Sequence, residues 1–181
     1  MKILMLISNG FEEIEAVTTI DILRRCGIEV HVCSMTGTRD ICGSHNIILK
    51  SDILFEQIDT EYDGIVLPGG LPNAHTLRDD KRIINIVKQY NKKEKVLAAI
   101  CAAPCVFSRC GILKDKKATS YPGSIDDNSC IYMKVKTITD GNIVTGNGVG
   151  GAIEFALATA YALGKIKETI KVRESILYDW N

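Results

Sequence analysis

Net charge, aromatic residues and long apolar runs are all scarce in this chain of 181 residues. Its 22 lysines and arginines balance 22 aspartates and glutamates. Without a basic stripe, neither nucleic acid nor an anionic membrane is expected as a main partner. No stretch approaches the roughly 18 apolar residues that span a bilayer, and the apolar run over residues 2–7 is shorter than a signal-peptide core. We therefore expect a soluble, cytoplasmic protein.

Cysteine pairs and histidine clusters are missing as well. The seven cysteines are irregularly spaced without any C-x-x-C pair, and the chain has only three histidines. This odd, irregular set argues against a disulfide framework. No histidine stands at metal-ligand spacing from a cysteine, which argues against a zinc site. The thiols are expected to be reduced and mostly buried.

Strand-like and helical segments alternate along the chain. Strands are expected over residues 2–7, 28–33, 62–67, 95–100, 116–121, 133–138 and 142–145, with a small hairpin over 35–49. Helices are expected over about 13–26, 79–92, 152–163 and 166–178, with a short one ending at Gly111. This alternation is typical of a parallel α/β sheet. We predict that residues 1–181 form one doubly wound domain.

The most informative segment is Ala98–Pro104, where an apolar strand stops at Cys101 and small residues lead into a short helix. Unpaired N–H groups and the helix dipole favour an anion at such a position, so the pKa of the Cys101 thiol is expected to fall. A thiolate at this turn would be a nucleophile. The alternative is a buried structural cysteine, because free cysteines are often buried.

In parallel sheets, ligands bind beyond the carboxyl ends of the strands. Three loops are expected there: residues 8–15, 68–70 and 101–102. The backbone N–H groups of Gly69 and Gly70 can approach a ligand closely, and with the N–H of Ala102 they would form an oxyanion hole. A Pro-Gly-Gly triplet on its own is more typical of a plain turn than of an oxyanion hole.

Acidic residues open the first helix at Glu12, Glu13 and Glu15. The helix dipole favours acids there, but Glu15 is placed on the inner side, where its carboxyl would approach Cys101. A carboxyl pressed against a thiolate and an apolar wall has a raised pKa and can donate a hydrogen bond to sulfur. The glycine-rich stretch Gly146–Gly151 matches no nucleotide-binding motif, so it is interpreted as a packing loop.

Four motifs occur in order along the chain: Gly10–Ala16, Tyr62–Gly70, Ala98–Pro104 and Glu154–Ala158. Together they resemble the ThiJ/PfpI superfamily, and specifically its DJ-1 branch, over essentially the whole chain. The resemblance implies a flavodoxin-like, mostly parallel sheet between helices, as in class I glutamine amidotransferases, and a homodimer. It also implies a reactive cysteine at Cys101, a protonated partner at Glu15, and backbone donors at Gly70 and Ala102.

Two departures from the family pattern restrict the chemistry. Many members have a histidine where this chain has Tyr121, which can donate a hydrogen bond but is no general base near neutral pH. Ala102 stands where protease-like and glyoxalase branches often have a histidine, so a Cys-His-acid triad is absent and a peptidase is not expected. His45 lies near a position that is often arginine in relatives, and it is a candidate contributor to the partner subunit's pocket.

The main hypothesis is a cysteine-dependent hydrolytic enzyme acting on α-oxoaldehydes or on glycated protein adducts, without metal or organic cofactor. Cys101 would attack the carbonyl, Glu15 would move the proton, and Gly70 and Ala102 would hold the oxyanion. The alternative is an oxidative-stress sensor or redox-regulated chaperone in which Cys101 is oxidised to a sulfinate. A flavin-binding carrier is suggested by fold class alone.

Overall fold

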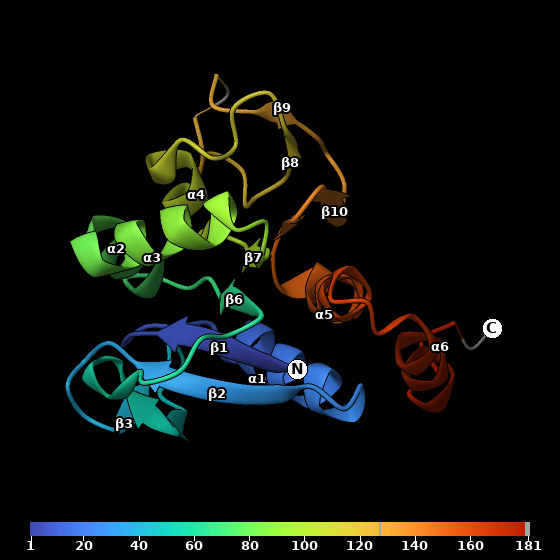
Figure 1. Ribbon diagram of the computed structural model, residues 1–181, viewed down its shortest axis with the longest axis horizontal. Coiled ribbons are helices and arrows are strands. Elements are labelled where there is room, and N and C mark those ends of the chain that lie inside the picture. Colours follow the sequence, from blue (N-terminus) through green and yellow to red (C-terminus); the bar gives the residue numbers. More distant parts are fainter. Residues whose placement is uncertain (127, 180–181) are drawn as a thin grey trace.

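The computed structural model describes residues 1–126 and 128–179, arranged as a central sheet with helices on both faces (Figure 1). Its elements in chain order are β1 (Lys2–Ile7), α1 (Glu13–Arg25), β2 (Glu29–Ser34), β3 (Asp40–Cys42), β4 (Ile48–Lys50), β5 (Ile53–Leu54), η1 (Phe55–Gln57), β6 (Gly64–Leu67), α2 (Asn73–Asp79), α3 (Lys81–Lys92), β7 (Val96–Ile100), α4 (Pro104–Cys110), β8 (Lys117–Ala118), β9 (Ile131–Tyr132), β10 (Thr137–Asp140), β11 (Ile143–Gly146), η2 (Val149–Gly151), α5 (Ala152–Ala162) and α6 (Ile166–Ser175).

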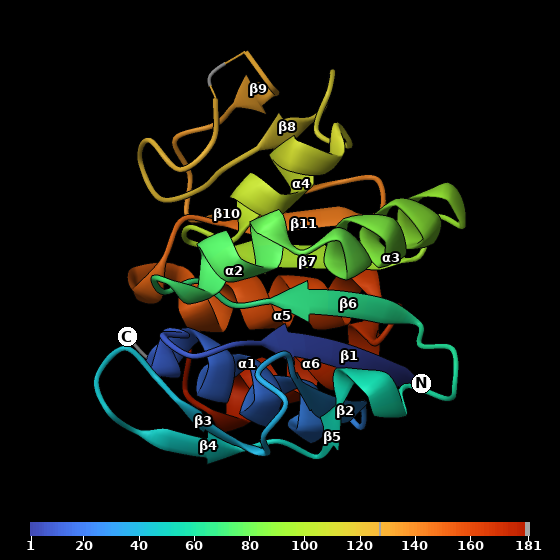
Figure 2. The same cartoon turned by 90° about the vertical axis from the view of Figure 1, so that its left-hand side faces the viewer.

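The main sheet has seven strands in the order β10-β11-β7-β6-β1-β2-β5 (Figure 2). All neighbouring pairs are parallel except β10 with β11. The chain runs outward from β1 to β2 in one direction and through β6, β7 and β11 in the other. This topology confirms the predicted doubly wound α/β fold, and it puts the point where the strand order reverses between β1 and β6.

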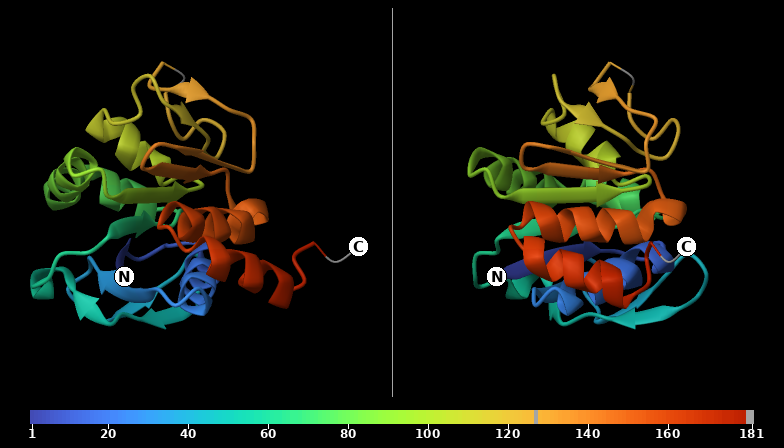
Figure 3. Two further views of the ribbon diagram at one scale, coloured as in Figure 1. Left: turned by 45° about the vertical axis from the view of Figure 1, so that its right-hand side comes forward. Right: turned by 90° about the vertical axis from the view of Figure 1, so that its right-hand side faces the viewer.

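Strand β1 shows why the sheet is covered on both faces. Its side chains alternate, so that Ile3, Met5 and Ile7 belong to one buried cluster and Leu4 and Leu6 to the other. Helices α1 and α5 pack on the first face with α6 against them (Figure 3), and α2, α3 and α4 pack on the second. Each fully buried aliphatic side chain contributes about 1.5–3 kcal/mol, so both faces hold the strands in register.

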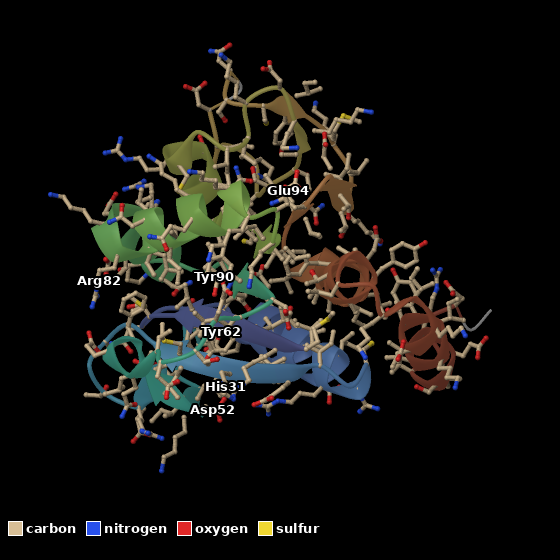
Figure 4. All side chains as sticks on the ribbon, viewed as in Figure 1. His31, Asp52, Tyr62, Arg82, Tyr90 and Glu94 are labelled. Carbon is tan, nitrogen blue, oxygen red and sulfur yellow. The ribbon has the colours of Figure 1, made fainter. Side chains whose placement is uncertain are left out.

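A chain of polar contacts closes the edge of the sheet where the strands begin. The backbone N–H of Tyr62 donates to the Tyr90 hydroxyl at 3.0 Å, and the Tyr62 hydroxyl lies 2.9 Å from His31 Nδ1. Figure 4 shows these three side chains in succession from α3 to β2. Because these groups satisfy one another's hydrogen-bonding capacity, they stabilise the amino-terminal edge of the sheet. The ligand loops meet at the opposite, carboxyl-terminal edge.

The predicted strands over residues 116–121 and 133–138 are wrong in most of their length. Only β8 and the start of β10 form, and β8 pairs with β9 in a separate two-stranded sheet. The reason is that side chains capture the backbone groups: the Thr145 hydroxyl accepts from Thr119 N–H, and the Thr119 hydroxyl donates to Val135 C=O. Helix α2 was also not predicted. None of the helices in the described ranges has the length and apolarity to cross a bilayer.

Phe155 on α5 offers a direct test of this packing. Its side chain is fully buried beneath Gly146 at the end of β11, whereas Tyr161 on the same helix is 56% exposed. We expect Phe155→Ala to lower the free energy of unfolding by about 3–5 kcal/mol, and Tyr161→Ala to change it by about 0.5 kcal/mol or less. Urea denaturation monitored by circular dichroism measures both. Equal losses in the two variants would contradict this placement of α5.

Candidate active site

The loops that follow β1, β6 and β7 meet at one edge of the sheet, as predicted. Asn73, at the start of α2 and fully buried, joins the first two loops. Its side-chain amide donates to the carbonyls of Pro68 and Gly69 at 2.8 and 2.9 Å, and its Oδ1 accepts from the N–H of Ser8 at 2.7 Å. Glu12 N–H also donates to Gly69 C=O at 3.1 Å. Asn73 is a positioning residue that no local sequence pattern reveals.

Cys101 occupies a strained turn between β7 and α4. Its φ is 62°, in the left-handed region that costs a residue with a side chain about 1–3 kcal/mol. Two backbone hydrogen bonds hold it there: Cys101 N–H donates to Gly146 C=O at 2.9 Å, and Tyr121 N–H donates to Cys101 C=O at 2.8 Å. The turn presents the thiol, which is partly exposed, to the pocket at the sheet edge.

Glu15 lies in the first turn of α1, and its side chain is completely buried beside the thiol. Its Oε2 accepts from the N–H of Gly69 at 2.8 Å. Its Oε1 is a neighbour of the Cys101 sulfur but has no hydrogen bond of regular geometry among the described residues. A buried carboxylate oxygen without a donor is costly. A protonated Oε1 would instead donate to the sulfur.

The ionisation of Glu15 and Cys101 is coupled. Burial raises the pKa of Glu15 to about 7, although the N–H of Gly69 acts in the opposite direction. Burial, together with the Glu15 carboxylate, raises the pKa of Cys101 to about 12, against the N–H groups of Ala102 and Gly70. The predicted fall in the thiol pKa is therefore wrong, because burial and a neighbouring negative charge outweigh the donors. Above about pH 7 the pair keeps one proton, and in that state a thiolate exists only when the proton is on Glu15.

The two predicted backbone donors, Gly70 and Ala102, lie near the sulfur. The N–H groups of Gly70 and Ala102 interact with Cys101 Sγ. Gly70 has a φ of 83°, and a Cβ there would lie 2.3 Å from the carbonyl oxygen of Gly10. A Cβ on Gly69 would lie 2.5 Å from the Cβ of Cys101. Both glycines are therefore needed for the close approach of this loop to the thiol.

An open pocket of about 410 Å³ lies over the thiol. Its lining includes Cys101, Tyr121, Pro122, Lys136, Asn147 and Gly148. Tyr121 is half exposed, so its phenol is available at the mouth of this pocket. Lys136 and Asn147 were not anticipated. Asn147 follows β11 at the same carboxyl edge and was detectable from that position, whereas Lys136 precedes the antiparallel strand β10, whose direction the sequence does not reveal.

His45 does not reach this pocket within its own chain. Its Nδ1 lies 2.9 Å from Glu13 Oε2 and 3.7 Å from Glu12 Oε2, and the hydrogen bond to Glu13 raises the pKa of the exposed imidazole. Across residues 1–126 and 128–179, these three side chains are the one group whose potential metal-ligand atoms cluster within 4.8 Å. The Glu13 oxygens already accept from His45 and from Ile47 N–H, so the cluster is satisfied internally.

Comparison with known proteins places the chain among relatives of the same architecture. Deglycase PH1704 of Pyrococcus horikoshii is 33% identical over 150 residues, covering 80% of this chain and 89% of that protein. Protein DJ-1 homolog B of Arabidopsis thaliana is 38% identical over 162 residues, covering 87% of this chain and 36% of that protein, so the chain spans about a third of that relative.

A solved structure of oxidised DJ-1 from Toxoplasma gondii superposes with a TM-score of 0.90 at 34% identity, covering 97% of both chains. The family model described as DJ-1/PfpI family matches residues 1–162, a span that includes Glu15, the glycine loop and Cys101. The chain therefore belongs to the DJ-1/PfpI family.

Proposed function

We propose that this protein is a cysteine-dependent enzyme that converts α-oxoaldehydes, or their early adducts with thiols and amines, into α-hydroxy acids. The observation that carries the proposal is the buried Glu15 carboxyl, with a pKa of about 7, beside the Cys101 thiol. A carboxyl that exchanges its proton near neutral pH is suited to general acid–base work. The name deglycase on the Pyrococcus horikoshii relative is consistent with this proposal.

With methylglyoxal, the reaction begins from the state in which Glu15 carries the proton and Cys101 is a thiolate. The sulfur bonds to the aldehyde carbon, and the carbonyl electron pair moves to oxygen beside the N–H groups of Gly70 and Ala102. That oxygen takes the proton from Glu15, giving a hemithioacetal. The Glu15 carboxylate then removes the proton from the former aldehyde carbon, and the neighbouring carbonyl oxygen is protonated, which gives an enediol. A proton is returned to the neighbouring carbon while the hydroxyl on the sulfur-bearing carbon loses its proton and becomes the thioester carbonyl. The resulting lactoyl thioester is cleaved by water, which releases lactate and the thiol.

Tyr121 has a limited part in this scheme. Its phenol can donate a hydrogen bond to a substrate oxygen at the pocket mouth, but a neutral phenol does not accept a proton near neutral pH. Glu15 is therefore the acid–base residue of the proposal. Cys101 and Glu15 act as one unit, so removing either one stops the same sequence of steps.

Lactate production from methylglyoxal tests the two roles. We expect Cys101→Ala to abolish turnover, because no covalent intermediate forms, and Glu15→Gln to lower kcat by about 10²–10⁴-fold, because proton transfer is lost. Cys110→Ala is the matched control, since this buried thiol on α4 lies outside the pocket lining and the variant should keep wild-type turnover. Unchanged turnover in Cys101→Ala would contradict the mechanism.

An inactive wild type whose Cys101 gains two oxygens under mild peroxide faster than Cys33 would favour the sensor alternative.

The pH dependence of alkylation tests the coupled ionisation. As pH rises through about 7 the pair loses its first proton, a fraction of Cys101 becomes thiolate, and the rate of labelling by iodoacetamide should rise. In Glu15→Gln the thiol titrates alone, and burial keeps its pKa above the ordinary value, so the inflection should move above pH 8. Peptide mass mapping of Cys101 gives the rates. The same inflection in both proteins would show that Glu15 takes no part in the ionisation.

We also propose that the protein forms a homodimer through the exposed face of α1 and the β3-β4 hairpin. Ile14 and Val17 are exposed on one side of α1, and Ile47 and Ile48 are exposed on the hairpin. The two elements are adjacent, since Glu13 accepts from the N–H of Ile47 at 3.5 Å. Four aliphatic side chains gathered on one face match the apolar, self-complementary patch of a two-fold interface. His45 borders this face, which would bring it near the partner subunit.

Replacement of Val17 and Ile48 by lysine tests the dimer. Two buried ammonium groups from each subunit cost several kcal/mol at a two-fold interface, so the double variant should elute as a monomer. Light scattering after gel filtration measures the mass. The control is Ile166→Lys together with Ile170→Lys, two exposed positions on α6, which should leave the dimer intact. A wild-type monomer at micromolar concentration would contradict the proposal.

A further inference from the structure

A second and larger pocket adjoins the one over the thiol. It has a volume of about 730 Å³, and it shares Pro122 and Asn147 with the pocket that contains Cys101. Its remaining walls come from the segments around Ser120 and Lys134. In Figure 2 the strands β8 and β9 that support these walls stand beyond β10 at one end of the sheet. A small oxoaldehyde would leave this space unfilled, so the site has room for an extended ligand.

Two positively charged side chains border the combined pocket. Lys134 lines the larger part and Lys136 lines the part over the thiol. No acidic residue is among the lining residues given for either part. In the described part of the chain, neither ammonium group makes an ion pair or a side-chain hydrogen bond, in contrast to Lys93, which pairs with Glu61 at 2.6 Å. Two such charges in a concave surface create a local positive potential.

The backbone that carries the two lysines is fixed at several points. The Tyr132 hydroxyl donates to Ser120 C=O at 3.0 Å, and the Thr119 hydroxyl donates to Val135 C=O at 3.0 Å. Asn147 N–H donates to Lys136 C=O at 2.9 Å, which joins this segment to the loop beside the thiol. These hydrogen bonds hold the backbone on both sides of Lys134, and they therefore fix the point on the pocket wall from which its side chain extends.

We propose that this extension binds an anionic group of the substrate, either a carboxylate or a phosphate, while the carbonyl carbon reaches Cys101. The substrates are then extended, negatively charged carbonyl compounds or adducts rather than neutral methylglyoxal alone. Lys136 would attract a negative charge close to the reacting carbon of the substrate. Lys134 would attract a negative charge on the part of the substrate farther from that carbon. The substrate class rests on the proposed function, but the binding of an anion does not.

Two aryl disulfides that differ in charge test the anion site without requiring turnover. Ellman's reagent carries a carboxylate on each ring, and 4,4′-dithiodipyridine is neutral at pH 8. Peptide mass mapping follows the rate at which each reagent modifies Cys101. We expect the rate with Ellman's reagent divided by the rate with 4,4′-dithiodipyridine to fall about three- to tenfold in Lys134→Gln. The ratio should fall further in Lys134→Gln/Lys136→Gln. Lys171→Gln, on α6 and outside the pocket linings, is the matched control and should keep the wild-type ratio. A ratio unchanged in the double variant, or lowered equally by Lys171→Gln, would overturn the proposal.

Competition identifies the anion. At constant ionic strength, inorganic phosphate or succinate should slow the labelling of wild-type Cys101 by 4,4′-dithiodipyridine, and Lys134→Gln should lose that protection. The more protective of the two anions indicates which group the site prefers, and failure of both to protect would argue against an anion site. A protein that makes no lactate but shows the charge-dependent labelling would refute the proposed activity while supporting this inference.

Discussion

The contact between the Glu15 carboxyl and the Cys101 thiol is the constraint on which the rest of the site depends. Both groups are acids in a buried place, and once the first proton is lost near pH 7 they retain the second, because two adjacent negative charges are too costly there. The single remaining charge is divided between oxygen and sulfur. Gly70 and Ala102 favour its location on sulfur, since their N–H groups interact with Sγ, whereas Gly69 favours the carboxylate through Oε2. Small geometric changes in one glycine loop therefore control how nucleophilic the thiol is.

The fold maintains this balance by fixing three loops that are distant in sequence. The left-handed conformation of Cys101 is held by hydrogen bonds to Gly146 and Tyr121, each from a different segment. Asn73 joins the loops after β1 and β6 through three hydrogen bonds. Gly146 ends β11, a buried strand of the sheet, so the strain at Cys101 is offset in part by contacts outside the turn itself. The conformation of the reactive turn is therefore held by hydrogen bonds from segments distant in sequence.

Local pattern predicts the inner strands of the sheet, the first helix and the position of Cys101, because apolar periodicity and the glycine after α1, Gly27, carry that information. The meeting of Glu15, Gly70 and Cys101 follows from the rule that ligand loops share the carboxyl edge of a parallel sheet. The direction of the thiol pKa was predicted wrongly, since it depends on burial and on the charge of a neighbour, which no sequence spacing measures. Lys136 escaped prediction because it precedes β10, whose antiparallel direction brings the beginning of that strand to the active edge.

The electrostatics of the site connect its chemistry to its choice of ligand. A thiol–carboxyl pair with one negative charge repels an approaching anion, and the low dielectric of a partly buried pocket strengthens that repulsion. Lys136 beside the thiol and Lys134 in the adjoining pocket counteract it without approaching the buried carboxyl as an ion-pair partner, which would lower the pKa of Glu15 and remove its proton. Positive charge on the pocket wall, separated from Glu15, is thus compatible both with an anionic ligand and with a protonated acid. The same pair of lysines placed against the carboxyl would favour neither the thiolate nor proton transfer.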